Sequence, residues 1–194
     1  MTSEIQHKRQ AWSVLIVSTL AFTVCFMVWM MFGVIGIPIK KMLDLNATQF
    51  GLLMAMPVLT GSLVRVFLGV WTEQFGGRRV SLIVMILAAA ATFLLSYAET
   101  YPQFLVAALG VGMAGGAFAV GVAYVSKFFP AGRQGTALGI FGAGNVGAAV
   151  TKFVAPFVMV AYGWQGVANL WAAALALMGV IFFVFAKDDP ALVE

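Results

Sequence analysis

Residues 10–39 read QAWSVLIVSTLAFTVCFMVWMMFGVIGIPI and contain no Asp, Glu, Lys or Arg. A membrane-spanning helix needs about 20 consecutive, mainly apolar residues, so this stretch predicts one. A secretory signal peptide is the alternative, because Lys8 and Arg9 precede the apolar run. The apolar core of a signal peptide is only about 7–15 residues long, however, and a small-residue cleavage site follows it. This run is much longer and has no clear cleavage site, so we expect a first membrane-spanning helix within residues 10–39.

The composition of the whole chain agrees with this prediction. Of its 194 residues, 62% are hydrophobic and only 9% are charged, whereas a soluble domain has about 45–50% apolar and about 25% charged residues. A soluble fold of this size could not hide so much apolar surface. Soluble, disordered and disulfide-stabilised proteins are therefore excluded. A β-barrel is set aside too, since its strands would give weaker apolar segments of about 10 residues.

The residue types give little support to metal, cofactor or enzyme chemistry. The single Cys25 excludes an internal disulfide, and the only histidine is His7 in the N-terminal tail. None of the predicted spans contains an acid–base pair or a nucleophile next to a base. We therefore expect no catalytic residue, no metal site and no cofactor, and a protein that is not an enzyme.

Five further apolar stretches follow the first and are separated by short connections. Their predicted limits are 48–71, 80–98, 101–126, 135–160 and 165–186. The predicted fold is thus an all-α membrane protein with six transmembrane helices. It divides into an N-terminal tail of residues 1–10, a six-helix bundle of residues 11–186 and a C-terminal tail of residues 187–194.

The basic residues predict the orientation of the bundle in the membrane. With six spans, one side carries 7 of the 11 basic residues: Lys8, Arg9, Arg78, Arg79, Lys127, Arg133 and Lys187. The other side carries only Lys40 and Lys41. Because cytoplasmic loops are enriched in Lys and Arg, we expect both termini in the cytoplasm and the chain in the inner membrane. The net charge of +4 then reflects topology, and no nucleic-acid partner is expected.

Two basic residues, Arg65 and Lys152, lie inside predicted spans. A basic group at mid-membrane costs about 2.5–3.5 kcal/mol, and such groups usually face a bundle interior or a cavity. The predicted spans contain no acidic residue that could pair with Arg65. Its planar guanidinium suits a planar oxyanion such as nitrate or carboxylate. Alternatively, Arg65 reaches toward the cytoplasmic interface or bonds backbone carbonyls, and Lys152 reaches toward the outer headgroups instead of serving a pathway.

Depth along the helices groups the candidate residues. At 1.5 Å per residue, Arg65, Phe118 and Asn145 fall roughly 3–8 Å from the bilayer centre on its cytoplasmic side, while Lys152 lies nearer the outer mouth. Asn145 and Lys152 are seven residues apart and so fall near one helix face. The helices that carry Phe118 and Asn145 are rich in glycine, which permits close helix packing. Taken alone, Asn145 would more often join helices, and Phe118 would more often pack or face lipid.

The loop between the second and third spans carries a known pattern. Residues 69–79 read GVWTEQFGGRR, which resembles the Gly-x-x-x-Asp-Arg-x-Gly-Arg-Arg signature of the major facilitator superfamily with one extra Gly. The matching positions are Gly69, Glu73, Gly76, Arg78 and Arg79. Gln74 stands where the family has a basic residue, so the chain departs from the family at a position that makes some of its gate contacts. The resemblance implies a tight cytoplasmic turn with a gating role.

Two more stretches are similar to the NarK-type nitrate/nitrite porters of this superfamily. Residues 62–69 (SLVRVFLG) place Arg65 where these porters have an anion-binding arginine, and residues 141–151 (FGAGNVGAAVT) resemble their nitrate signature. The substrate-binding residues that the resemblance implies are Arg65, Asn145, Phe118, Gly144 and Gly147, with Lys152 as a pathway or coupling residue. It further implies transport of nitrate or nitrite, in the form of proton-coupled uptake.

The superfamily has twelve spans in two halves of six, with the substrate between the halves. This chain ends soon after its sixth predicted span, so it resembles the N-terminal half. Three arrangements stay open: pairing with a separate complementary half, a parallel homodimer that places two copies of Arg65 face to face, or a truncated or split subunit without transport of its own. Outside transport, the alternative is a six-span scaffold without a pathway.

Overall fold

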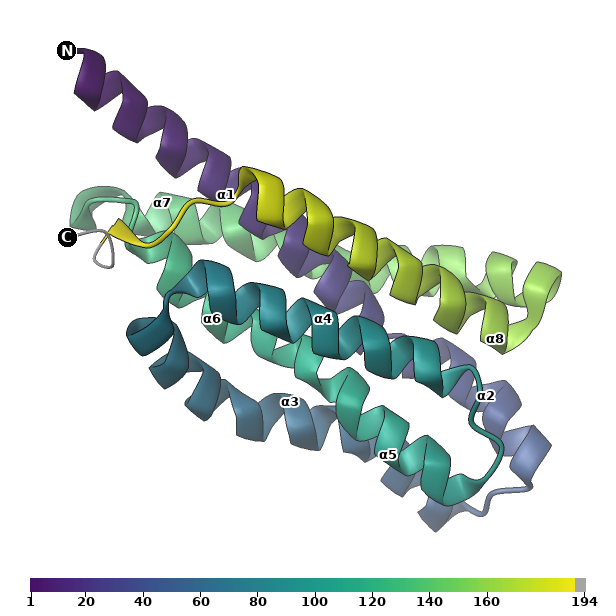
Figure 1. The fold of residues 1–194 in the computed structure, drawn as a ribbon. Coiled ribbons are helices and arrows are strands. Elements are labelled where there is room, and N and C mark those ends of the chain that lie inside the picture. Colours follow the sequence, from purple (N-terminus) through teal and green to yellow (C-terminus); the bar gives the residue numbers. More distant parts are fainter. Residues whose placement is uncertain (191–194) are drawn as a thin grey trace.

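The computed structural model describes residues 1–190 as a bundle of helices that lie along one another (Figure 1). The α-helices are α1 (Thr2–Trp29), α2 (Phe32–Leu43), α3 (Ala47–Phe75), α4 (Gly77–Leu95), α5 (Tyr101–Val111), α6 (Ala117–Ser126), α7 (Ala131–Gly142) and α8 (Val146–Phe185). Two short 3₁₀ helices, η1 (Gly112–Gly116) and η2 (Ala143–Asn145), join α5 to α6 and α7 to α8.

Several helical runs of the described residues are long and apolar enough to cross a membrane. They are Thr2–Leu43, Ala47–Phe75, Gly77–Leu95, Tyr101–Ser126 and Ala131–Phe185. The all-α membrane fold predicted from the sequence is therefore confirmed. The last run is 55 residues long and contains both of the last two predicted spans. Six crossings in total therefore stay a prediction.

The last run turns back on itself at Gly163, at one end of the bundle (Figure 1). Gly163 has φ 75° and ψ 178°, a conformation that is open essentially to glycine alone. The two arms of α8, before and after Gly163, are joined by a hydrogen bond of 2.9 Å that the indole of Trp171 donates to Oγ1 of Thr151. The Thr151 hydroxyl in turn donates to the carbonyl of Met27 at 2.8 Å and ties both arms to α1.

Side-chain caps fix where two of the helices begin. The Asn46 side chain accepts a hydrogen bond of 2.8 Å from the backbone N–H of Gln49, and the Gln49 side chain accepts one of 3.1 Å from the backbone of Asn46. The side chain of Gln103 likewise accepts from the backbone of Thr100 at 3.2 Å. Such capping boxes satisfy backbone donors that the first turn of a helix leaves unpaired, so α3 and α5 start close to the predicted span limits.

The core lies where α8 packs against α1 and α4. Its largest fully buried side chains include Leu15, Phe104, Tyr124, Phe141 and Phe182. The outward faces are apolar as well: Val160 is 88% exposed and Phe153 is 74% exposed. An apolar surface of this extent is what a protein presents to lipid or to another protein.

The start of α1 and the end of α8 lie at the same end of the bundle (Figure 1). There the hydroxyl of Ser13 donates a hydrogen bond of 3.3 Å to the carbonyl of Phe185. The predicted N-terminal tail, residues 1–10, forms the exposed beginning of α1. Of the predicted C-terminal tail, residues 191–194 lie outside the described residues. The limits of both tails and the cytoplasmic placement of both termini stay predictions.

Replacing Gly163 by Ala tests the turn in α8. A Cβ at this φ and ψ strains the backbone, which costs about 1–3 kcal/mol, so we expect Gly163→Ala to lower the melting temperature in detergent. Gly179→Ala is the matched control, because a Cβ at Gly179 meets nothing within 4 Å and alanine favours helix. Equal melting temperatures for the two variants would contradict the assigned turn.

Candidate functional site

Arg65 lies on α3 and is half-buried against η1 and α1. Its Nε donates a hydrogen bond of 3.2 Å to the carbonyl of Gly115. Its guanidinium carbon lies 5.4 Å from the ring centre of Trp29 on α1, which makes a cation–π contact. The guanidinium is thus held from two sides by groups that carry no formal charge.

The local backbone explains how these contacts form. Residues 112–116 read GMAGG and form the 3₁₀ helix η1, which interrupts the regular α-helical hydrogen bonds of this segment. A Cβ at Gly115 would lie 2.6 Å from the indole of Trp29, so only glycine leaves room for that ring. The indole also donates a hydrogen bond of 3.0 Å to the carbonyl of Pro57 on α3. Glycine therefore lets η1, α1 and α3 meet around Arg65.

No carboxylate pairs with Arg65 among residues 1–190. The ion pairs of this part of the chain join Arg78 to Asp188, Lys127 to Glu73 and Lys127 to Asp189. Within the same residues, the hydrogen bond to Gly115 engages Nε and leaves the Nη1 and Nη2 donors of Arg65 without a protein acceptor. An anion with two oxygens matches that pair of donors in shape and charge.

A strip of aromatic rings runs along α1 from Arg65 to Phe118. The strip consists of Phe22, Phe26 and Trp29, with ring centres 5.5 Å apart at each step. At its far end Phe22 lies 5.5 Å from the ring of Phe118 on α6, which is 40% exposed. Arg65 and Phe118 are therefore joined through the strip rather than by direct contact.

The glycine-rich segment around η2 lies on the same region of α1. A Cβ at Gly144 would collide with the ring of Phe22, and one at Gly147 would collide with the backbone carbonyl of Thr23. Both glycines thus serve close packing of α8 and η2 on α1. The amide of Asn145 is exposed and donates a hydrogen bond of 2.8 Å to the carbonyl of Gly142, one turn earlier. Binding of substrate by these three residues stays a prediction.

Lys152 follows the buried Thr151 on α8 and is exposed. Its neighbour Thr151 holds the two arms of α8 to α1 through the hydrogen bonds described above. Lys152 makes no ion pair with a described residue. A role in a pathway or in proton coupling therefore stays a prediction.

The predicted loop motif forms a tight turn between α3 and α4. Gly76 has φ 89°, which favours glycine. At the extra glycine, Gly77, a Cβ would collide with the ring of Tyr124, so this residue lets α4 approach α6. Gly69 faces open space, since a Cβ there meets nothing within 4 Å. Arg79 is exposed. The turn is thus confirmed, and its role in gating stays a prediction.

Arg78 of this motif joins the turn to the end of α8. Its Nη1 pairs with Asp188 at 3.2 Å, and its Nη2 donates a hydrogen bond of 2.8 Å to the carbonyl of Phe183. The ring of Phe183 also lies 5.0 Å from the guanidinium carbon. Because Arg78 is held by three groups of the same helix end, the turn and the segment after α8 form one unit.

Lys127, at the end of α6, lies between two carboxylates. Its Nζ is 2.6 Å from Asp189, which is 1% exposed, and 3.3 Å from Glu73 of the loop motif. The hydroxyl of Tyr124 donates to the carbonyl of Lys187 and accepts from its backbone N–H. Burial alone would lower the pKa of Lys127, but the hydrogen bonds that its ammonium donates to Asp189 and Glu73 outweigh burial and raise that pKa.

The sequence reasoning missed two parts of this arrangement. The aromatic strip could have been found, because residues 22, 26 and 29 are spaced by four and three and therefore share one face of a helix. The pairing of Lys127 with Asp189 had no local signal, since 62 residues separate the two side chains. The described residues also contain no group of three His, Cys, Asp or Glu that could hold a metal ion.

The pH dependence of stability tests the Lys127 pairing. A raised pKa means that the pairing stabilises the fold fully below the unfolded pKa of about 10.4 and is lost as pH rises through the folded pKa. We expect Lys127→Met to lower the melting temperature by about 2–4 °C at pH 7. The difference from wild type should shrink above about pH 10.4. Lys8→Met is the control, and a difference that does not shrink as pH rises through the titration of the lysine would contradict the pairing.

Known proteins resemble this chain in sequence and in fold. The family model of the Major Facilitator Superfamily matches residues 17–194. A probable nitrate/nitrite antiporter NarK1 of Thermus thermophilus is 41% identical, over 91% of this chain and 43% of that protein. A probable nitrate transporter NarT of Staphylococcus carnosus is 33% identical, over 87% and 44%. The nitrite extrusion protein of Bacillus subtilis is 32% identical, over 86% and 42%.

The fold agrees with these matches. The crystal structure of a bacterial homolog of the human lysosomal transporter Spinster, in an inward-facing and unoccupied conformation, superposes with a TM-score of 0.80 at 18% identity, over 93% of this chain and 44% of that chain. The present chain thus spans less than half the length of the curated relatives it matches. The resemblance to NarK-type porters is confirmed, and the chain belongs to the major facilitator superfamily.

Proposed function

We propose that this chain is the N-terminal half of a transporter for nitrate or nitrite in the inner membrane. The observation that carries the proposal is the setting of Arg65. Its guanidinium lies within a membrane-spanning helix, without a carboxylate partner among the described residues and with two nitrogen donors unpaired. A charge held in this way needs an anion, and the anion that it lacks in the protein is then the substrate.

The shape of the guanidinium favours a planar oxyanion over a halide. Two parallel N–H donors match two oxygens held in one plane, whereas a single spherical chloride can accept them only through converging, less linear bonds. The curated relatives are named as nitrate or nitrite transporters, and their matches extend over 86–91% of this chain. We therefore favour nitrate and nitrite among the planar anions.

The neighbouring groups fit the same substrate. Phe118 offers an exposed ring face at the end of the aromatic strip, against which a planar anion can lie flat. Asn145 uses one of its two amide hydrogens within its own helix and keeps the other for a ligand. In this proposal Gly144 and Gly147 keep α8 and α1 close enough for these groups to act together.

Partial coverage of the relatives supports the proposal of a half-transporter. The relatives match over less than half of their own length, and in this superfamily the substrate lies between two six-helix halves. We infer that the segment 131–185 crosses the membrane twice, with Gly163 at the outer turn, and that both termini are cytoplasmic. The second wall of the site then comes from a complementary half or from a second copy of this chain.

Proton coupling is part of the proposal. Lys152 is the exposed basic residue on the arm of α8 that also carries Gly147, and we assign it the coupling role in uptake. A subunit without transport of its own stays the alternative, and the experiment below separates it from the proposal.

Anion binding to the purified chain in lipid nanodiscs tests the proposed function. By calorimetric titration, we expect nitrate and nitrite to bind more tightly than chloride. Arg65→Lys should weaken nitrate binding about tenfold or more, because an ammonium cannot offer two parallel donors. Arg79→Lys, at an exposed loop position, is the matched control and should bind as wild type does.

The results of these binding and uptake measurements distinguish the proposed function from its alternatives. Equal affinity for the three anions, or nitrate binding that Arg65→Lys leaves unchanged, would contradict the assignment of Arg65. Nitrate uptake into vesicles that contain this chain alone would favour the homodimer. Binding without uptake would favour a complementary half. No binding of any anion would favour a subunit without a substrate site.

A further inference from the structure

We propose that Trp29 is a positioning residue that aims Arg65 at the anion; this inference rests on the proposed function of Arg65. The indole of Trp29 contacts the guanidinium through its ring face and α3 through its N–H. No motif in the sequence singled out this residue. Its placement in the structure makes it the side chain that determines where the guanidinium lies.

The indole is itself fixed in position. Its Nε1–H donates a hydrogen bond of 3.0 Å to the carbonyl of Pro57, eight residues before Arg65 on the same helix. A Cβ at Gly61 would lie 3.0 Å from that nitrogen, and one at Gly115 would lie 2.6 Å from it. Two glycines on facing segments thus form a slot for the ring. A ring that cannot tilt gives the guanidinium a fixed surface.

Arg65 needs such a surface because its side chain is long and flexible. Without a partner for its ring face, the guanidinium could swing toward the cytoplasmic interface, as long basic side chains near helix ends do. The contact with Gly115 engages Nε alone. Together, the Gly115 carbonyl and the Trp29 ring define the plane of the guanidinium and leave Nη1 and Nη2 for the ligand. Preorganisation of this kind raises affinity by reducing the ordering cost on binding.

A purely structural role for Trp29 makes different predictions. If the ring only fills space between α1 and η1, nitrate affinity depends on the size of the ring and not on the charge distribution of its face. If it positions Arg65 through a cation–π contact, affinity depends on the negative charge of the ring face. Fluorine atoms withdraw that charge with little change in size, so a series of fluorinated tryptophans separates the two roles.

The experiment measures nitrate binding and melting temperature for the full chain in nanodiscs. Site-specific incorporation of mono-, di- and trifluorotryptophan at position 29 should weaken nitrate binding stepwise while the melting temperature stays constant. Trp29→Leu should weaken binding about tenfold, and Trp29→Phe should weaken it less because it keeps a ring face. Trp71→Leu is the control, since Trp71 is an exposed tryptophan on α3 whose ring contacts Phe67 rather than Arg65.

The results discriminate between this inference and the proposed function. Nitrate binding that is lost in Arg65→Lys but is constant across the fluorinated series would overturn the Trp29 inference alone. A wild-type chain that binds no nitrate would overturn the proposed function and this inference with it. If Trp29→Leu fails to fold, the fluorinated series and Trp29→Phe still decide the question.

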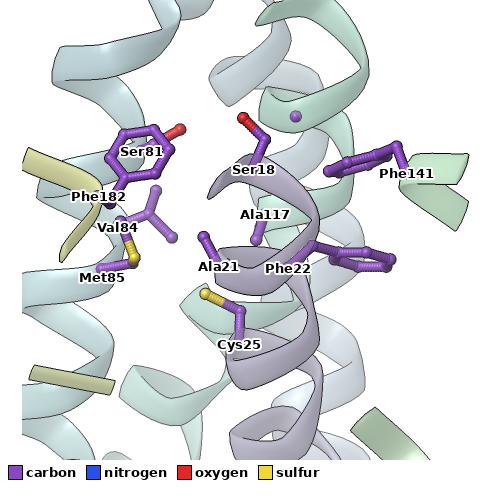
Figure 2. Close-up of a pocket in the computed structure, with 11 residues that line it drawn as sticks. Ser18, Ala21, Phe22, Cys25, Ser81, Val84, Met85, Ala117, Phe141 and Phe182 are labelled. Carbon is purple, nitrogen blue, oxygen red and sulfur yellow. The ribbon is translucent and has the colours of Figure 1, made fainter. Parts of the chain in front are cut away.

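The geometry also points to one ordered water molecule in a cavity between α1, α4 and α6. The cavity has a volume of about 20 Å³, and a water molecule needs roughly 10–15 Å³ by the same measure. Figure 2 shows the Ser18 hydroxyl directed into this space from α1, with Ser81 on the facing helix. Ser18 is 4% exposed, and its hydroxyl has no hydrogen-bond partner among the described residues.

A buried hydroxyl without a partner is costly, and buried waters usually satisfy such groups. Ser18 and Ser81 are two hydroxyl groups that line the cavity, while Cys25 contributes a weaker thiol. The rest of the lining is apolar and includes Phe22, which belongs to the aromatic strip, and Phe141, whose ring stacks on that of Phe22. A water held by the two hydroxyls would thus join α1 to α4 directly behind the strip.

Paired serine variants test this water site. If a water bridges the two hydroxyls, Ser18→Ala and Ser81→Ala each lower the melting temperature. The melting temperature of the double variant is then no lower than that of the less stable single variant. Density for a water within hydrogen-bond distance of Ser18 Oγ in a high-resolution structure would confirm the site. A melting temperature that rises or stays constant in Ser18→Ala, or a dry cavity at that resolution, would overturn it.

Discussion

The structure depends on how one positive charge is kept inside an apolar bundle. A guanidinium in this setting must keep its hydrogen bonds and some compensating charge, or its burial becomes too costly. Arg65 meets part of that need with a backbone carbonyl and the face of an indole, neither of which neutralises it. The remaining charge and two nitrogen donors are what an oxyanion would satisfy. In the proposed function, binding of the anion would complete an arrangement that the described residues leave incomplete.

Glycine makes this arrangement sterically feasible. At Gly115 it admits the indole beside Arg65, and at Gly144 and Gly147 it brings η2 and α8 onto the same face of α1. Glycines, which have no side chain, therefore position the candidate substrate-binding residues as much as the larger side chains do. The turn after α3 is joined to the segment after α8 by the ion pairs of Arg78 and Lys127.

Much of the fold could be predicted from the sequence, because charge-free runs such as residues 10–39 have one stable form in a bilayer. The limits of the apolar runs placed the starts of α3 and α5 within one residue of Ala47 and Tyr101, and the loop motif located the turn at Gly76. The sequence could not show that Gly144 and Gly147 contact α1, because helix pairing is not encoded in spacing. The same is true of Trp29, whose importance arises from three segments that meet only in the folded chain.

A high-resolution structure of this chain in nanodiscs, determined with nitrate, tests the central claim most directly. The account predicts a planar anion with two oxygens within about 3.2 Å of Nη1 and Nη2 of Arg65, with the guanidinium still on Trp29 and Gly115. An anion bound elsewhere, or an Arg65 side chain turned away to a lipid headgroup at saturating nitrate, would contradict it.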